Sequence, residues 1–408
     1  MKTDADILII GAGASGMAAA LEAERVRPGS RIVLLERADR PGKKLLTTGN
    51  GRCNLSNRET GLSCYNPGAE RFSSVLERYG DDRGFFRSLG LLTKEDREGR
   101  IYPLSGQASA VLDTLRFAVS DSGAEVICSA EVTQIEKEDS RFTVYVSDGR
   151  KFTADKVIIA AGSPAGAHGF GNERMITSLT GNGVPFRPFS PALVYLTVRD
   201  LPAQLKGVRA QAEVSLVCED GRSFTETGEV QFADGYVSGI CVMDLSRKLD
   251  EGSRAELVMD FCPGISREDI RDSIETAMKT RGESPASAVL AGLVPKAVGE
   301  TILRSACSDI FRRKTASLTA GEIGAVTDLI KNYRFEVSGK GPFRSAQICT
   351  GGAGDADGST LGSQACRGLY FCGEFVDVDG RCGGYNLHWA WASGRAAGAA
   401  AAAALKEP

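Results

Sequence analysis

The sequence has few of the residues that build metal centres and dithiol relays. Its 408 residues include only two histidines, and no two of its eleven cysteines are separated by two residues. Zinc sites need closely spaced cysteine and histidine ligands, and dithiol relays commonly use the C-x-x-C arrangement. We therefore expect no metal site, no dithiol relay, and free thiols in a reducing compartment.

Strong net charge and long apolar segments are also missing. The formal net charge is −3, which gives no general attraction to nucleic acid or to an anionic membrane. No apolar run approaches the roughly 20 residues of a membrane-spanning helix, and the polar first residues are unlike a secretory signal peptide. We expect a cytoplasmic protein without membrane contacts, whose length allows two or three domains and whose oligomeric state is open.

The N-terminal residues combine a buried strand, a glycine-rich turn and a helix. Residues 6–10 form an apolar run typical of a strand in a parallel sheet. In the turn that follows, Gly11 permits the tight bend, Gly13 permits close approach of a pyrophosphate, and Gly16 lets the helix pack on the strand. The helix predicted over 17–25 would direct its first N–H groups at the phosphates.

An acidic residue ends the second predicted strand, over 31–36. The Glu36 carboxylate would accept hydrogen bonds from ribose hydroxyls and repel a 2′-phosphate. The turn and this acid together predict an adenosine diphosphate site. Its predicted contacts are Gly11, Gly13, Ala14, Ser15, Gly16, Glu36 and Arg37.

The far end of the chain carries a second strand, glycine loop and helix. A short apolar strand over 369–372 precedes Gly373-Glu374, and a glycine pair precedes an Ala-rich helix over 387–405. That helix would direct its positive end at the negative charge of a reduced flavin, or it is simply a packing helix. Both ends together predict a flavin across the domain. The predicted contacts here are Gly373, Glu374, Asp377, Gly383, Gly384, Tyr385, Asn386 and Leu387.

Two further segments are predicted to contact the cofactor. The loop over 41–54 places turn-forming residues beside cations that would balance pyrophosphate charge, although a solvated loop is the alternative. Strands predicted over 126–135, 142–146 and 156–161 would form a hairpin that returns to the nucleotide sheet and place Val132 at the adenine. The contacts from these segments are Lys44, Gly49, Asn50, Gly51, Arg52, Cys53, Asn54, Val132, Ala161 and Gly162.

The pattern changes at about Ser190. Strands are predicted over 192–198, 210–218, 223–227, 255–259 and 333–337, with helices over 266–280, 286–293, 298–307 and 319–332. Ser266 with Asp269, and Thr319 with Glu322, match N-terminal capping boxes. The fold class is therefore α/β: a Rossmann-like FAD-binding domain (1–189 and 346–408) interrupted by a β-rich, barrel-like domain (190–262 with 333–345) and a small helical domain (263–332). We expect the insert to act as a substrate lid.

A basic cluster on the predicted helical part has two interpretations. Arg312-Arg313-Lys314, with Arg304 and Lys296 nearby, is either a solvated face or a site for an anionic substrate or nucleic acid. No aromatic residues are interleaved to stack single-stranded bases.

Candidate proton donors follow from the chemistry of flavins, which transfer hydride while the protein supplies a proton. Cys53 comes first, because a thiol is mostly protonated at neutral pH; the alternative is a buried packing residue. Tyr385 comes second, with packing at the flavin edge as its alternative. His388 is expected to be structural, and His168 to be a loop or cofactor-contact residue.

These motifs resemble the HI0933-like flavoproteins, also called the aminoacetone oxidase family or BaiN-like FAD-binding enzymes. Matching stretches occur over 11–16, 42–54, 160–162, 228–239 and 351–398. The segment 232–239 lacks the histidine and proline of the family's Phe-Thr-His-x-Gly-x-Ser-Gly-Pro stretch, and Cys382 stands at a position that is usually threonine.

The resemblance implies an FAD-dependent oxidoreductase with non-covalent FAD. The preferred reaction is reduction of an activated C=C bond in a small molecule, with NAD(P)H as a transient electron donor. An amine oxidase that uses O₂, and reduction of a pyrimidine base in structured RNA through the region of Arg312 to Lys314, are the alternatives. A structural or sensing role for FAD is a non-enzymatic alternative.

The first prediction is that the purified protein carries FAD rather than FMN or NAD, because Glu36 and the turn from Gly11 to Gly16 serve an adenosine diphosphate. Mass spectrometry of the ligand released by heat checks it. Recovery of FMN alone, or no flavin after reconstitution, would contradict it.

Overall fold

The computed structural model describes residues 2–166, 172–307 and 309–406 and divides into two compact units. The first unit comprises Met1–Ser190 and Ile348–Pro408, and the second comprises Pro191–Gln347. The chain therefore leaves the first unit once and returns to it. The mixed α/β fold class is confirmed, whereas the division of the second unit into two domains stays a prediction.

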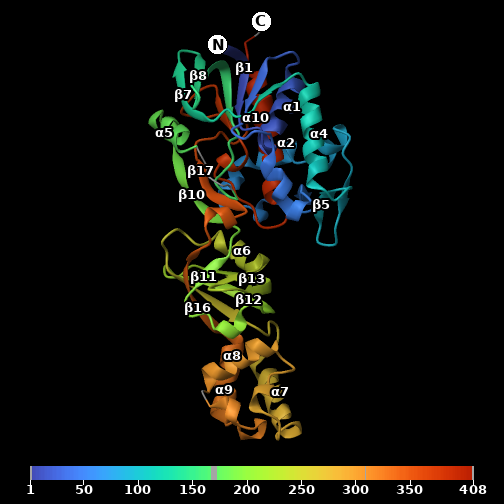
Figure 1. The fold of residues 1–408 in the computed structure, drawn as a ribbon, viewed down its shortest axis with the longest axis vertical. Helices are drawn as coiled ribbons and strands as arrows, with labels where there is room; N and C mark the ends of the chain where they lie inside the picture. Colours follow the sequence, from blue (N-terminus) through green and yellow to red (C-terminus); the bar gives the residue numbers. More distant parts are fainter. Residues whose placement is uncertain (1, 167–171, 308, 407–408) are drawn as a thin grey trace. The chain divides into compact units, whose positions relative to one another are not determined.

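A seven-stranded sheet forms the centre of the first unit, in the order β6-β2-β1-β9-β8-β7 with β18 also on β9 (Figure 1). The strand β9 lies parallel to β1 on one side, and on the other side it pairs with β8 and then with β18. Segments from both ends of the chain thus meet on β9. The strands are β1 (Lys2–Ile10), β2 (Ile32–Leu35), β6 (Glu125–Ile127), β7 (Val132–Glu138), β8 (Arg141–Val146), β9 (Lys151–Ile159) and β18 (Leu369–Phe371).

The single strand predicted over 126–135 is wrong. The strand β6 pairs with β2, whereas β7 pairs with β8 on the opposite side of the sheet. Between them the chain turns through Ser129, which has a left-handed φ of 51°. The backbone N–H groups of Ser129 and Ala130 donate to the carbonyls of Ala38 and Glu36. The apolar pattern runs through this break, because both strands are half-buried.

Two helices that are distant in sequence cross with their backbones in contact. These are α1 (Ala14–Val26) and α10 (Tyr385–Ala403) (Figure 1). A Cβ added to Gly394 would lie 2.3 Å from the carbonyl oxygen of Ser15, and one added to Gly398 would lie 2.1 Å from that of Ala19. Glycines at these two positions, one helical turn apart, let α10 lie directly against α1.

Smaller elements complete the first unit. A three-stranded sheet has the order β3-β5-β4, and a separate two-stranded sheet joins β10 to β17. The sequence pattern over residues 56–121 predicts none of these elements. The elements are β3 (Ser56–Asn57), β4 (Thr93–Glu95), β5 (Arg100–Pro103), β10 (Phe186–Ala192), β17 (Ile348–Ala353), α2 (Ser73–Tyr79), α3 (Asp82–Ser88), α4 (Ala108–Asp121) and α5 (Glu173–Gly181).

The second unit contains a closed barrel in the order β11-β14-β13-β12-β15-β16. Buried residues alternate with partly buried ones along β15, and with exposed or partly buried ones along β12, so one side of each strand faces the barrel core. The strands are β11 (Leu196–Val198), β12 (Arg209–Cys218), β13 (Ser223–Phe232), β14 (Tyr236–Ser238), β15 (Ala255–Asp260) and β16 (Tyr333–Lys340). The helices are α6 (Ile240–Ser246), α7 (Arg267–Thr280), α8 (Lys296–Ala306) and α9 (Ala320–Lys331).

Three predictions for this unit need correction. The helix predicted over 286–293 is only a 3-10 turn at Ala286–Ala288, the strand predicted over 192–198 is interrupted between β10 and β11, and α6 was not predicted. Both predicted helix starts are present. Thr319 and Glu322 form a complete capping box, whereas Ser266 caps α7 by accepting the N–H of Asp269.

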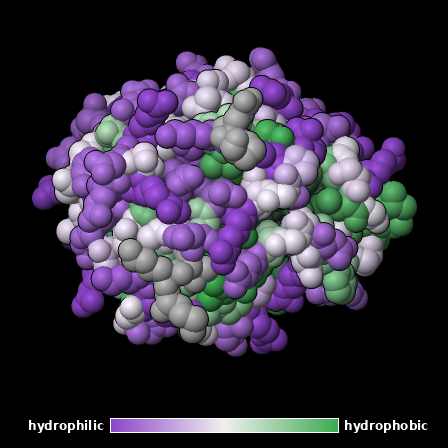
Figure 2. Space-filling view, turned by 90° about the horizontal axis from the view of Figure 1, so that it is seen from above, coloured by the Kyte–Doolittle hydropathy of each residue, from purple (hydrophilic) through white to green (hydrophobic). Residues whose placement is uncertain are grey.

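The face of the molecule seen in Figure 2 is mostly polar, with apolar residues gathered mainly toward its right edge. Isolated exposed apolar side chains are normal for globular proteins. Within the described ranges, no helix is both long enough and apolar enough to span a bilayer.

The second prediction concerns the helix crossing. Gly398→Ala should destabilise the first unit by about 1–3 kcal/mol through overpacking against Ala19, although alanine favours an isolated helix by about 0.8–1 kcal/mol. Denaturant unfolding followed by tryptophan fluorescence checks it, because both tryptophans, Trp389 and Trp391, are buried in α10.

The control is Gly324→Ala in α9, where an added Cβ meets nothing within 4 Å. It should leave the fluorescence transition unchanged. Equal midpoints for Gly398→Ala and wild type would show that the close crossing does not limit the stability of this unit.

Candidate cofactor site

The turn from Gly11 to Gly16 leaves an open space above the first turn of α1. Gly11 has a φ of +103°, and a Cβ there would lie 2.4 Å from the carbonyl oxygen of Ala160; a Cβ on Gly16 would lie 1.9 Å from that of Gly11. These two glycines are required by the protein's own packing. A Cβ on Gly13 would meet nothing within 4 Å, so packing within the protein does not require glycine there, and the predicted role of this residue is close approach of a ligand.

The start of α1 suits a phosphate. Gly13 caps the helix without a side-chain hydrogen bond, and its carbonyl accepts the N–H of Met17. The N–H groups of Ala14, Ser15 and Gly16 therefore have no carbonyl partner within the helix. Such unpaired N–H groups and the helix dipole together favour an anion.

Glu36 connects the end of β2 to the glycine turn. Its carboxylate accepts hydrogen bonds from the N–H groups of Ala12 (3.0 Å) and Ala38 (2.8 Å). A carboxylate offers about four lone-pair positions, so two remain for the ribose hydroxyls that the sequence predicts. The hydrogen bonds from Ala12 and Ala38 also hold the carboxylate beside the turn. The sequence pattern does not predict these two bonds.

Four strand ends bring predicted contact residues to one edge of the parallel sheet. Gly11 follows β1, Glu36 follows β2, Gly162 comes shortly after β9, and Gly373 comes shortly after β18. In open α/β sheets, ligands bind outside the carboxyl ends of the strands. Val132 instead begins β7, where it pairs with Val146, and its predicted contact with adenine stays a prediction.

The cations predicted to face the pyrophosphate have partners within the protein. The Lys44 ammonium lies 2.7 Å from the Glu374 carboxylate, which also accepts the hydroxyl of Ser163 at 3.0 Å. The Arg52 guanidinium lies over the ring of Tyr102, 4.7 Å from its centroid. Ser163 and Tyr102 were not predicted, because no local pattern links them to these cations. The contact of Lys44 with Glu374 ties the loop to the end of β18.

The loop itself has an unusual backbone. Gly49, Asn50, Gly51 and Cys53 all have left-handed φ values between 54° and 79°. Such conformations cost about 1–3 kcal/mol for residues other than glycine and persist where the surrounding structure holds them, often at ligand sites. The segment Lys43–Gly51 is a 3-10 segment with an internal kink, and most of its residues are exposed. Its contact with a cofactor stays a prediction, with the solvated loop as the alternative.

Cys53 is fully buried, and this burial raises the pKa of its thiol to about 11. Protein atoms enclose the side chain, and a thiol with this raised pKa stays protonated at neutral pH. The burial favours the packing alternative over the role of proton donor.

The start of α10 presents unpaired N–H groups, as the sequence predicts for the second half of the site. Gly384 caps the helix with a φ of +101°, and the N–H groups of Tyr385, Asn386 and Leu387 have no carbonyl partner within the helix. The Asn386 side chain bonds both backbone groups of Gly380, so it holds the preceding loop.

Two of the predicted C-terminal cofactor contacts, Gly384 and Asp377, also have contacts within the protein. A Cβ on Gly384 would lie 2.4 Å from the carbonyl oxygen of Ser56, so a bulkier residue would distort this turn whatever ligand it faces. The carboxylate of Asp377 accepts the guanidinium of Arg187 and the N–H of Gly351. Asp377 therefore has a role in the structure itself, and its contact with a cofactor stays a prediction.

Tyr385 is half-buried, and burial together with Cys64 raises the pKa of its phenol to about 12. The hydroxyl therefore remains protonated at neutral pH. His388 is buried, in agreement with a structural role, and it contacts Asp82. His168 lies outside the described residues.

The cationic cluster of the second unit is largely paired with acids. Arg313 contacts Glu322 at 2.5 Å and Asp309 at 3.4 Å, and Lys314 pairs with Glu283. The Arg313 guanidinium holds the pKa of Glu322 well below its usual range. These contacts support a structural role for Arg313 and reduce the positive charge available to RNA.

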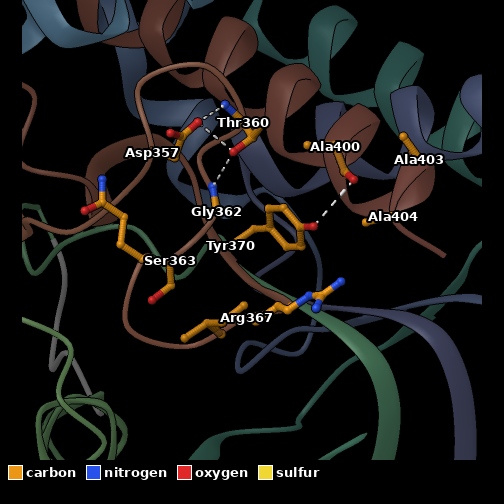
Figure 3. Close-up of a pocket in the computed structure, with 12 residues that line it drawn as sticks. Asp357, Thr360, Gly362, Ser363, Arg367, Tyr370, Ala400, Ala403 and Ala404 are labelled. Atoms are coloured by element: carbon orange, nitrogen blue, oxygen red, sulfur yellow. Dashed lines mark hydrogen bonds between the residues drawn. The ribbon is translucent and has the colours of Figure 1, made fainter. Parts of the chain in front are cut away.

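A hollow elsewhere in the first unit, of about 430 Å³, is not the predicted site. It is lined by residues before and within β18 and by the end of α10, and none of the predicted contact residues lines it. Figure 3 shows the hydroxyl of Tyr370 directed at the Ala400 carbonyl there. In the described part of the chain, no group of three or more potential ligands could hold a metal ion.

Comparison with known proteins identifies relatives along the whole chain. The model of the HI0933-like protein Rossmann domain matches residues 5–400. A 3-dehydro-bile acid delta(4,6)-reductase of Clostridium scindens is 36% identical, over 97% of this chain and 98% of its own length. A ribosomal RNA dihydrouridine synthase of Haemophilus influenzae is 26% identical, over 96% of this chain and 97% of its own.

Among solved structures, the chain is similar to a 3-ketosteroid-delta4-(5alpha)-dehydrogenase from Rhodococcus jostii. That structure has a TM-score of 0.45 at 14% identity, covering 98% of this chain and 97% of the other. A flavocytochrome c3 fumarate reductase has a TM-score of 0.47 at 16% identity, covering 98% and 78%.

The third prediction is that Gly13→Val abolishes flavin retention while the protein stays folded. The valine Cβ would enter the open space above α1, where it meets no protein atom within 4 Å, and the side chain would exclude a pyrophosphate. Flavin absorbance per protein after purification, with thermal unfolding of the same samples, measures both effects.

The matched control is Gly181→Val at the end of α5, where an added Cβ also meets nothing within 4 Å. It should keep the flavin. Flavin occupancy at the wild-type level in Gly13→Val would show that this turn does not bind the phosphates.

Proposed function

Because the chain belongs to the HI0933-like family, it is an FAD-dependent oxidoreductase, and we propose that it reduces a C=C bond conjugated to a carbonyl group in a small molecule. The observation that carries this proposal is the full-length similarity to the bile-acid reductase, at 36% identity. The bound flavin supplies the hydride, and NAD(P)H is the proposed transient donor.

The chain's own residues have four proposed tasks. The N–H groups at the start of α1 hold the pyrophosphate, and the carboxylate of Glu36 holds the ribose of the adenosine. The N–H groups at the start of α10 stabilise negative charge on the flavin ring. A general acid then protonates the substrate carbon next to the one that receives the hydride.

Tyr385 is the stronger candidate for that acid. Its phenol is half-buried and protonated, whereas the thiol of Cys53 is enclosed by protein. Both residues were proposed from the sequence, and their difference in exposure separates them. For this proton transfer, the substrate carbon must lie within hydrogen-bonding distance of the Tyr385 hydroxyl.

Reduction of a pyrimidine in RNA is a second candidate, favoured by the relatives named ribosomal RNA dihydrouridine synthases. The bond chemistry is the same, since dihydrouridine is uridine with its ring C=C bond reduced. The acid partners of Arg313 and Lys314 weaken this candidate, because a binding face for RNA needs unpaired cations. No contact in the described residues specifically favours an amine oxidase.

The fourth prediction tests the reaction by anaerobic stopped-flow absorbance. NADH or NADPH should bleach the flavin, and a 3-keto-4-ene steroid should restore its colour faster than O₂ does. Bleaching by an amine with no response to NAD(P)H would support the oxidase. Recovery of the flavin colour only with unmodified ribosomal RNA would support the pyrimidine reaction.

The fifth prediction concerns the proton donor. Tyr385→Phe should slow reoxidation by the steroid about 10²–10⁴-fold, the usual contribution of a general acid, with little effect on bleaching by NAD(P)H. Cys53→Ser is the comparison variant and should reoxidise at nearly the wild-type rate. The opposite order of the two rates would assign the proton to Cys53.

A further inference from the structure

A buried pair of ionisable side chains, His388 and Asp82, joins the first turn of α10 to the start of α3. His388, in the first turn of the helix, places Nδ1 2.6 Å from Oδ2 of Asp82, at the start of α3. Their side chains are 1% and 3% exposed. The second imidazole nitrogen and the second carboxylate oxygen have no hydrogen-bond partner among the described residues. A pair so buried and incompletely satisfied is costly, so packing alone is a poor reason for it.

The pair is connected to the glycine turn that begins α10. Ser56 in β3 places its hydroxyl 3.3 Å from Nδ1 of His388, and its carbonyl oxygen lies against Gly384. The neighbouring side chain of Asn57 donates to the carbonyl of Gly383 at 3.0 Å. The strand β3 therefore contacts the Gly383–Gly384 turn through the Ser56 carbonyl and the Asn57 side chain, and it contacts His388 through the Ser56 hydroxyl.

Charged and polar groups surround the pair formed by Asp82 and His388. Burial raises the pKa of Asp82, and contact with His388 opposes that shift. Further along α10, Arg395 pairs with Glu22 of α1 and donates to the carbonyl of Tyr79. His388 and Ser56 therefore both bond the Asp82 carboxyl at the first turn of the helix, and the charge of Arg395 also attracts it.

We propose that His388 is a positioning residue: with Asp82 it fixes the first turn of α10, and by doing so it sets the reduction potential of the bound flavin. This inference depends on the proposed function only in placing the flavin ring at that turn. Three N–H groups, of Tyr385, Asn386 and Leu387, stabilise negative charge only if their direction is fixed. Loss of the pair loosens the turn and weakens the reduced state.

The test compares His388→Leu with His388→Asn, whose amide nitrogen occupies nearly the place of Nδ1 and still donates to Asp82. Flavin-loaded protein is titrated spectroelectrochemically without substrate. At a fixed potential the ratio of reduced to oxidised flavin should fall at least tenfold in His388→Leu, about 30 mV for a two-electron couple. In His388→Asn it should change less than threefold.

A second measurement uses the flavin-free protein. Hydrogen exchange at the backbone N–H of residue 388, which bonds the carbonyl of Gly384, should be at least tenfold faster in His388→Leu, with no change over 396–401, where α10 packs on α1. Should His388→Leu fail to fold, Asp82→Ala breaks the same contact from the other side, and the same shifts are expected.

Two outcomes would overturn the proposal. An unchanged reduction potential in a folded His388→Leu protein, with or without faster exchange, would leave His388 as a structural residue only. An equal shift in His388→Leu and His388→Asn would show that the bond to Asp82 is not the cause. Neither outcome depends on which substrate the enzyme reduces, so failure of the reductase proposal is distinguishable.

Discussion

The close crossing of α1 and α10 is the constraint on which the site depends. The two halves of the site lie at opposite ends of the chain, and the crossing brings them together. Gly394 and Gly398 let the helices touch, and Ser393 and Trp389 bond the backbone of Gly373 at the end of β18. The nucleotide turn, the β18 edge and the α10 start therefore form one rigid group.

Several cationic side chains of this protein interact with partners in the protein itself. Lys44 pairs with Glu374, Arg52 lies on Tyr102, and Arg313 pairs with Glu322. The unpaired polar groups at the predicted cofactor site are mainly backbone N–H groups at two helix starts. Fixed dipoles of this kind stabilise charge without the reorganisation that long cationic side chains require.

The sequence predicted the parallel sheet, the glycine turn and both helices, because apolar runs and glycine spacing report burial and turns directly. It did not predict β3 to β5 or the break at Ser129, since short half-buried segments carry no distinctive period. It could not rank Cys53 against Tyr385, because burial arises from contacts between distant segments. Asp82 was missed for the same reason: only the fold brings it to His388.

The single excursion of the chain between β10 and β17 has a consequence for biosynthesis. The first unit lacks β18 and α10 until the last residues have been made, more than two hundred positions after Ser190. At roughly 5–20 residues per second of synthesis, its N-terminal part waits incomplete for tens of seconds on the ribosome. The second unit, continuous in sequence, can fold during that interval. The order of synthesis therefore allows the insert to complete its fold before the unit that encloses it in sequence, while the nascent N-terminal sheet still lacks β18 and α10.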